Sequence, residues 1–135
     1  MTDKKNLRLI DANLNRLREG IRVVEDIFRY VYDDKKISSK LKELRHLSRL
    51  ENYKEILETR DIKNDVLRES IKSEQNRADL YSILIANFKR AQESARVLEE
   101  FCKLISIKES ENFKYIRYEL YNLEIVLTKI TSNSK

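Results

Sequence analysis

The near absence of glycine and proline limits the fold of this chain more than any other feature. Its 135 residues contain one glycine and no proline. Sheets joined by tight hairpins are therefore not expected, because the turns that close such hairpins need residues that tolerate positive φ. Gly-rich phosphate loops are excluded for the same reason, since neither a P-loop nor a dinucleotide-binding fingerprint can be written with one glycine.

Apolar residues recur at the helical spacing in four segments. The first segment steps by three and four from Leu7 to Val31 and is expected to end at Asp33-Asp34. The other helices are predicted from Ser38 or Ser39 to about Leu50, with a weak continuation to Ile56 and Leu57, from about Ser73 to Ile105, and from Ser110 to Ile130, with the serines at 38 or 39 and 110 as caps. Residues 59–72 are predicted to form a loop. Short links within each pair and one longer crossover indicate an all-α four-helix bundle.

Charge and composition exclude several classes of protein. Lysine and arginine number 28 and aspartate and glutamate 23, which gives a net charge of +5. Because the two signs are mixed, this excess favours small anionic ligands over nucleic acid. No apolar run approaches the roughly 18 residues that span a bilayer, and no signal-peptide pattern is present. A single cysteine, Cys102, excludes an internal disulfide. We expect one cytoplasmic domain over residues 1–135.

The first and third predicted helices share one pattern. Ala-Asn-x-x-Arg-x-x-Glu-x-x-Arg-Val-x-Glu occurs at residues 12–25 and again at 86–99. The second and fourth helices echo one another more faintly, at residues 42–46 and 114–118. The chain is therefore predicted to consist of two helical hairpins, at about 7–57 and 73–131, related by a pseudo-two-fold axis.

Repeated polar residues fall within the apolar stripes of these two helices. On a helical wheel, Asn13, Arg16 and Gly20 lie inside the stripe of the first helix, and Asn87, Arg90 and Ser94 lie inside that of the third. An arginine in such a stripe needs a partner. One interpretation is a buried ladder in which Arg16 meets Glu93 and Arg90 meets Glu19. The other is a central pocket, in which arginine would bind phosphate and asparagine would read the edge of a heterocycle.

Two further groups carry chemistry. His46 is the only histidine, and beside Arg45 it is either a packing residue or a phosphate contact. Asp61 and Asp65 follow Arg60 in the crossover. They are either solvated turn formers or ligands of Mg²⁺, which needs only one or two protein carboxylates beside substrate phosphates.

Several of these segments together resemble a known family. They are residues 8–26, Leu-Arg-His at 44–46, Arg-Asp at 60–61 with Asp-Val at 65–66, Ala-Asn-Phe-Lys-Arg at 86–90, Arg96 with Glu99-Glu100, and Arg117-Tyr118 with Tyr121 and Glu124. The chain is similar to the small monofunctional hydroxymethylpyrimidine phosphate kinases of thiamin biosynthesis, which occur alone or fused ahead of thiamin phosphate synthase. Leu67 stands where the family pattern has glycine.

The resemblance implies transfer of a phosphoryl group from ATP to 4-amino-5-hydroxymethyl-2-methylpyrimidine phosphate, with Mg²⁺. Arg16 and Arg90 would be catalytic, and Asp61 and Asp65 would hold the metal. The remaining site residues would bind substrate and nucleotide: Asn13, Glu19, Arg22, Arg45, His46, Arg60, Asn87, Glu93 and Arg96. One half of the repeat would keep the acceptor and the other the nucleotide. Thiamin phosphate synthase and a second copy of the chain are the candidate protein partners.

Two other function classes compete with this one. One alternative is an enzyme similar to the small helical chorismate mutases, which the segment Leu-Arg-Leu-Ile-Asp at 7–11 and the all-helical pattern resemble. Those enzymes lack the internal duplication. A non-catalytic helical adaptor or RNA-binding bundle would instead have clusters of arginine facing solvent and a dry central seam.

Overall fold

The computed structural model describes residues 3–70 and 77–132, and its regular elements are all helical. Four long helices dominate: α1 (Lys4–Asp26), α2 (Lys35–Leu47), α5 (Leu80–Phe101) and α6 (Ile107–Ser132). A π-helical turn, Ile27–Val31, extends α1, the short helix α3 spans Tyr53–Leu57, and a 3-10 turn, Cys102–Leu104, follows α5. The predicted all-α bundle is confirmed. None of the described helices is long and apolar enough to cross a membrane.

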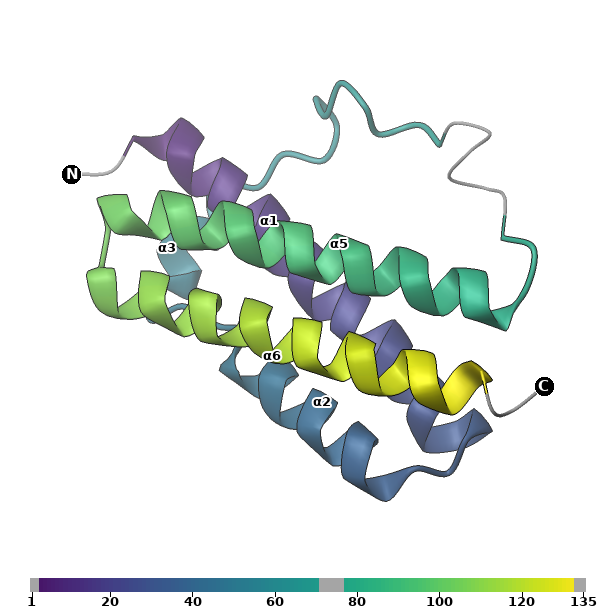
Figure 1. Cartoon of the computed structure of the whole chain (residues 1–135). Helices are drawn as coiled ribbons and strands as arrows, with labels where there is room; N and C mark the ends of the chain where they lie inside the picture. Colours follow the sequence, from purple (N-terminus) through teal and green to yellow (C-terminus); the bar gives the residue numbers. More distant parts are fainter. Residues whose placement is uncertain (1–2, 71–76, 133–135) are drawn as a thin grey trace.

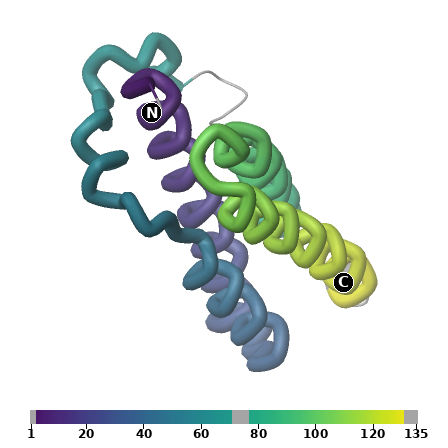
Figure 2. Tube along the Cα trace, turned by 90° about the vertical axis from the view of Figure 1, so that its left-hand side faces the viewer, coloured from purple at the N-terminus to yellow at the C-terminus, as the bar shows by residue number. Residues whose placement is uncertain are grey.

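Helices α1 and α5 form the centre of the bundle. They run in opposite directions and make the most extensive contact between any two helices of the described chain (Figure 1). Helix α2 packs against α1, and α6 packs against α5, so each hairpin contributes one inner and one outer helix. The crossover is the segment between α3 and α5, of which residues 58–70 and 77–79 are described. Its first part lies beside the first turns of α1 (Figure 2). This arrangement is the one expected for two repeated hairpins.

Aspartates cap α1, α2 and α5, and Ser106, rather than the predicted Ser110, accepts from the backbone of Glu109 at the start of α6, at 3.3 Å. The side chains of Asp3, Asp34 and Asp79 accept hydrogen bonds from the backbone at the starts of α1, α2 and α5, at 2.8, 2.9 and 2.8 Å. The predictions of caps at Ser38 or Ser39 and at Ser110 are wrong. Ser38 donates to the Asp34 carbonyl from inside α2, and Ser110 is buried in α6. A serine within a helix can bond to a preceding carbonyl instead of a free N–H, and sequence does not distinguish the two uses.

The ends of the helices also differ from the prediction in places. Helix α5 begins at Leu80 rather than near 73, and residues 73–76 lie outside the described part of the chain. The first helix ends before Asp33, as predicted, and Asp33 adopts a positive φ of 50°. Aspartate is one of the few residues other than glycine that tolerate this conformation. The turn between α1 and α2 is therefore made without glycine.

The apolar residues of the predicted stripes form one continuous core. Phe28, Phe88 and Phe113 are fully buried and bring the two hairpins together with leucines and isoleucines of all four long helices. Leu50 lies beyond the end of α2 but is still only 5% exposed. Ile56 is buried on α3, whereas Leu57 is largely exposed. The second predicted helix is thus two helices that share one buried side.

At Gly20 the backbone of α1 lies close to α5. A Cβ atom at this position would lie 3.0 Å from the Asn87 carbonyl oxygen and 3.3 Å from the Ala91 Cβ. Ser94, at the equivalent place in the second repeat, is also small and buried. The space at Gly20 is therefore filled by the backbone of α5, so that the central seam between the repeats is dry at this point.

We expect Gly20→Leu to destabilise the protein, because the added side chain must push α5 away from α1. Overpacking of this kind costs about 1–3 kcal/mol, which corresponds to a melting temperature lower by roughly 3–10 °C. Thermal unfolding followed by circular dichroism measures the change. Arg18→Leu places the same side chain on the exposed side of α1 and should change the melting temperature little. Equal melting temperatures for the two variants would contradict the close approach.

Cys102 is predicted to be unreactive in the folded protein. It is fully buried, and this burial raises the pKa of its thiol to about 12. At about pH 8 the thiol therefore stays protonated, whereas an exposed cysteine, with a pKa of about 8.5, is partly ionised. Alkylation by iodoacetamide, followed by mass spectrometry, should be slow in buffer and fast in concentrated urea. Equal rates in the two conditions would show that Cys102 is accessible.

Candidate functional site

Two adjoining grooves on α1 collect most of the predicted site residues. The first, which we call the interhelix groove, lies between α1 and α5 and has a volume of about 560 Å³. It is lined by Asn13 and Arg16 of α1 and by Ala86, Lys89, Arg90, Glu93, Ser94 and Val97 of α5. Both repeats therefore contribute their polar motif residues to one concave surface.

The second, the crossover groove, lies between the first half of α1 and the described crossover and has a volume of about 290 Å³. It is lined by Lys5, Arg8, Leu9, Asp11, Ala12, Asn15 and Arg16 of α1 and by Arg60, Asp61, Ile62 and Asp65 of the crossover. Arg16 lines both grooves. The crossover residues, far from Arg16 in sequence, are thus brought beside it.

Arg16 and Arg90 are exposed and lack ion-pair partners among residues 3–70 and 77–132. The ladder that would join Arg16 to Glu93 and Arg90 to Glu19 is not formed within these residues, and all four side chains are exposed. The expectation that the two arginines lie within the buried stripes is wrong. Their long side chains carry the charge out to solvent from positions at the edge of the stripe. Both guanidinium groups are therefore free to bind an anion.

Asn13 and Asn87 do lie at the seam, and the structure uses them in the same way. The amide nitrogen of each donates to the carbonyl four residues earlier, Asn13 to Leu9 at 3.0 Å and Asn87 to Ile83 at 2.8 Å. Asn13 is 6% exposed, and it lines the interhelix groove while Asn87 does not. One N–H of the Asn13 amide is used in this way, so that its amide oxygen, a hydrogen-bond acceptor, and its second N–H remain for a ligand.

Arg60 fastens the crossover to α1. Its Nε and Nη2 atoms both lie 2.9 Å from the carboxylate of Asp11, which is almost fully buried. The hydrogen bonds to Asp11 raise the pKa of Arg60 above its already high value. Arg8 adds a second tie, donating from Nη2 to the carbonyl oxygen of Asp61 at 3.0 Å. Arg60 is therefore a positioning residue whose charge is already neutralised.

Asp61 and Asp65 act as turn formers within the crossover and also line its groove. Asp61 accepts hydrogen bonds from the backbone and side chain of Asn64, at 3.1 and 2.6 Å, and these bonds lower its pKa. Asp65 accepts from the backbone of Leu67 at 3.0 Å. Among the described residues no group of three acidic, histidine or cysteine side chains could hold a metal ion. A cation bound here would need further oxygen ligands from a substrate.

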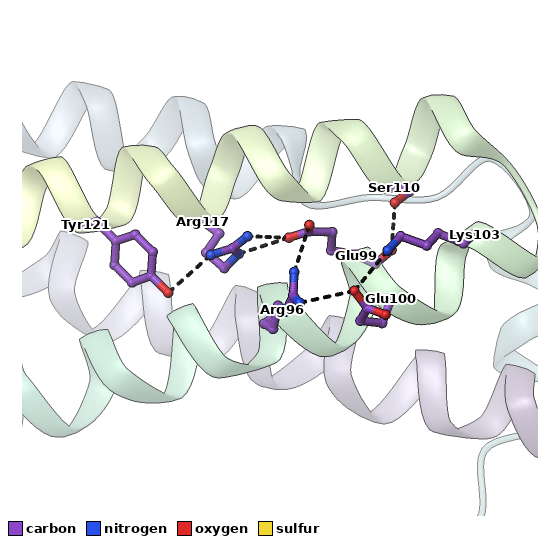
Figure 3. A network of polar contacts seen from close by, with 7 residues as sticks. All are labelled: Arg96, Glu99, Glu100, Lys103, Ser110, Arg117 and Tyr121. Carbon is purple, nitrogen blue, oxygen red and sulfur yellow. Dashed lines mark hydrogen bonds and ion pairs between the residues drawn. The ribbon is translucent and has the colours of Figure 1, made fainter.

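Several predicted site arginines instead form ion pairs within the protein. Arg45 binds Glu25 through two nitrogens, at 2.6 and 3.1 Å, and this pairing raises its pKa. The second repeat contains the same arrangement, in which Arg117 binds Glu99 at 2.9 and 2.8 Å (Figure 3). Each pair joins the inner helix of a hairpin to its outer helix. Neither Arg45 nor Arg117 lines one of the two grooves.

Arg96 and Arg22 are also occupied, in more exposed pairs. Arg96 contacts both Glu99 and Glu100, at 3.0 and 3.3 Å, at the edge of the same network (Figure 3). Arg22 lies 3.4 Å from Asp26 on the surface of α1. His46 lies in a different, shallow groove on α2, with Lys42 and Arg49. The predicted set is therefore divided, because Arg22, Arg45, His46 and Arg96, with Glu19 and Asn87, line neither groove.

The sequence interpretation missed several polar residues that line the grooves. Lys5 and Arg8 lie one turn apart at the start of α1, and Asn15 precedes Arg16. Lys89, in the interhelix groove, precedes Arg90 in the same way that Asn15 precedes Arg16, so the two residues occupy equivalent positions of the repeat. That shared position beside Arg16 and Arg90 was a signal in the repeat, but the residue types differ. For Lys5 and Arg8 no repeated pattern was available.

Breaking the Glu25–Arg45 pair should strongly destabilise the fold. In Arg45→Met the carboxylate of Glu25, 2% exposed, would remain buried without a partner. We expect the free energy of unfolding in urea to fall by about 3 kcal/mol. Arg22→Met is the matched control, because its ion pair is about half exposed and should contribute less than about 1 kcal/mol. Equal losses in the two variants would contradict a structural role for Arg45.

Comparison of the sequence with known proteins identifies the family of this chain. The sequence model of the ThiD2 family matches residues 8–126. The thiamine-phosphate synthase of Thermosynechococcus vestitus is 39% identical over 90% of this chain and 35% of its own length, and that of Prochlorococcus marinus strain SARG is 38% identical over 96% and 38%. The chain thus spans little more than a third of these relatives. No solved structure matches it. The chain belongs to the ThiD2 family.

Proposed function

We propose that this chain is a kinase that transfers a phosphoryl group from ATP to 4-amino-5-hydroxymethyl-2-methylpyrimidine phosphate in thiamin biosynthesis. Membership of the ThiD2 family and similarity to proteins named thiamine-phosphate synthase support a role in that pathway. The observation that carries the proposal of phosphoryl transfer is Arg16, a cation without an ion-pair partner in the described chain that is shared by two adjoining grooves. Two phosphorylated substrates need such a shared charge where they meet.

The reaction forms one bond and breaks one. An oxygen of the acceptor's phosphate attacks the terminal phosphorus of ATP, and the bond from that phosphorus to the oxygen bridging it to the next phosphate breaks. ADP leaves with the electron pair, and the acceptor becomes a diphosphate. Since the attacking oxygen belongs to a phosphate, which is ionised at neutral pH, the reaction needs no strong general base. Positioning and neutralisation of charge account for most of the catalysis.

The arginines of the grooves supply what a Gly-rich loop supplies in other kinases. Arg16 and Arg90 bind phosphate oxygens through their planar guanidinium groups, which stay charged in any environment that a groove provides. Arg60 holds the crossover in place through Asp11 and leaves the phosphates to the unpaired cations. The helices fix the backbone positions of these two arginines before substrate arrives, and the exposed side chains become ordered when the phosphates bind.

Mg²⁺ fits this site as an ion shared between protein and nucleotide. Asp61 is partly buried and Asp65 is exposed; both offer hard oxygen ligands and line the groove that also contains Arg16. Mg²⁺ keeps several waters and is commonly held by one or two carboxylates together with substrate phosphates. When bound, it would neutralise charge on the phosphates of the nucleotide. The two aspartates would hold it directly or through water.

The relatives also support a functional association with a thiamine-phosphate synthase. In the proteins of that name this chain corresponds to little more than a third of the length. The diphosphate that the proposed reaction produces carries a good leaving group, and a synthase that joins the pyrimidine to a second unit consumes such an activated compound. We propose that this chain supplies it.

The non-catalytic alternative is favoured by one observation and is tested directly. Exposed arginines beside a dry helix–helix seam are what an RNA-binding bundle also predicts, and Arg16 and Arg90 are exposed. Thermal shift distinguishes the two functions. Stabilisation by the pyrimidine phosphate or by ATP with Mg²⁺ supports the kinase, whereas stabilisation by RNA alone, lost steeply with salt, supports the alternative.

A coupled assay of ADP release, with the pyrimidine phosphate as acceptor, tests the proposal. We expect the unmodified chain to release ADP only when the acceptor and Mg²⁺ are present. Arg90→Leu should lower kcat/KM about 100-fold, because a charged contact to phosphate is lost. Arg18→Leu, on the same kind of exposed helix surface but outside both grooves, is the control and should retain activity. The proposal would be overturned if ADP were released without the acceptor, or if no ADP were released when the acceptor is present.

A further inference from the structure

We infer that the crossover groove binds the metal-bound phosphates of the nucleotide, that the interhelix groove binds the pyrimidine phosphate, and that Arg16 contacts the transferred phosphoryl group between them. This assignment rests on the proposed function and extends it. It follows from the different charges and hydrogen-bonding groups of the two grooves, which the repeat in the sequence does not distinguish.

The crossover groove has the chemistry of a site for a polyphosphate and a divalent cation. Lys5 and Arg8 bring positive charge from α1, while Asp61, which is partly buried, and Asp65, which is exposed, bring two carboxylates. Arg60 and Asp11 neutralise one another and leave the balance of the other groups unchanged. A phosphate chain alone would be repelled by the two aspartates, whereas one that carries Mg²⁺ is matched by both signs of charge.

An apolar rim completes this groove. Ile62 is 63% exposed, although it lines the groove beside Asp61. Exposed apolar side chains at the edge of a charged groove can cover the flat face of a base. The nucleotide is therefore expected to place its phosphates near Arg16 and its base over the crossover.

The interhelix groove instead has the chemistry of a site for an amino-substituted ring bearing a single phosphate. It contains one carboxylate, that of Glu93, and no second acidic side chain with which to hold a metal. The amide oxygen of Asn13 and the carboxylate of Glu93 are acceptors, which match the hydrogens of an aromatic amine. Lys89 is drawn to Glu124 at 3.2 Å, so Arg90 is the cation left for the phosphate.

Arg16 is suited to contact both substrates because it belongs to both grooves and has no ion-pair partner within the described residues. The fully buried neighbours Leu14 and Leu17 fix this turn of α1 in the core. The phosphoryl group therefore passes directly from one groove to the other. His46 lies outside both grooves, and Asp61 and Asp65, whose carboxylates could also accept a phosphoryl group, are assigned to the cation. Both substrates must accordingly be bound together.

Isosteric changes on either side of Arg16 test the assignment. Isothermal titration calorimetry of Asp65→Asn should show affinity for ATP with Mg²⁺ reduced about tenfold, and that for the pyrimidine phosphate unchanged. Glu93→Gln should show the opposite pattern. Arg16→Leu should weaken both, and each substrate should still bind when the other saturates the unmodified chain. Initial rates of that chain should give intersecting, rather than parallel, double-reciprocal lines.

The outcomes separate this inference from the proposed function. If the unmodified chain binds both ligands but Asp65→Asn and Glu93→Gln weaken the same one, or if the ligands compete, the assignment of the grooves is overturned and the kinase proposal stands. If the chain binds neither ligand, both are overturned. Arg18→Leu, outside the grooves, shows whether a changed affinity reflects loss of surface charge in general, and an equal loss there would overturn the assignment.

Discussion

The contact between α1 and α5 at Gly20 is the constraint on which the rest of the structure depends. Because Gly20 has no side chain, the backbone of α1 packs directly against Asn87 and Ala91 of α5. Arg16 and Arg90 then project from opposite sides of one groove. A larger residue at Gly20 would widen the groove and displace both arginines, so the packing and the geometry of the site are one property.

A second constraint divides the arginines into two classes. Arg45 and Arg117 form ion pairs with Glu25 and Glu99, and these nearly buried pairs hold each outer helix against its inner helix. Removing either partner would leave a charge in a place where water cannot solvate it. Arg16 and Arg90, which have no carboxylate partner among the described residues, line the grooves instead. The family pattern contains both classes, and only the fold shows which arginine belongs to which.

The sequence predicted the architecture because helical phase alone assigns the apolar residues to a core, and the repeat supplied the pairing of the hairpins. It could not predict that Arg16 is exposed, since a helical wheel gives the direction of the Cα–Cβ bond and not the place of a charge several bonds away. It also could not pair Arg45 with Glu25, because that contact depends on how α2 lies on α1. Arg117 and Glu99, at the matching places of the second repeat, were the available signal.

The crossover breaks the symmetry of the duplicated scaffold. Asp11 forms the ion pair with Arg60, and the equivalent residue in the second repeat is Ile85. The residue equivalent to Arg8 is Ser82. An aliphatic side chain and a short hydroxyl cannot anchor a charged loop, so α5 lacks the means to build the corresponding groove. Under the proposed function, the two faces of the repeat would therefore differ, with a donor end and an acceptor end, and each chain would turn over a single pair of substrates at a time.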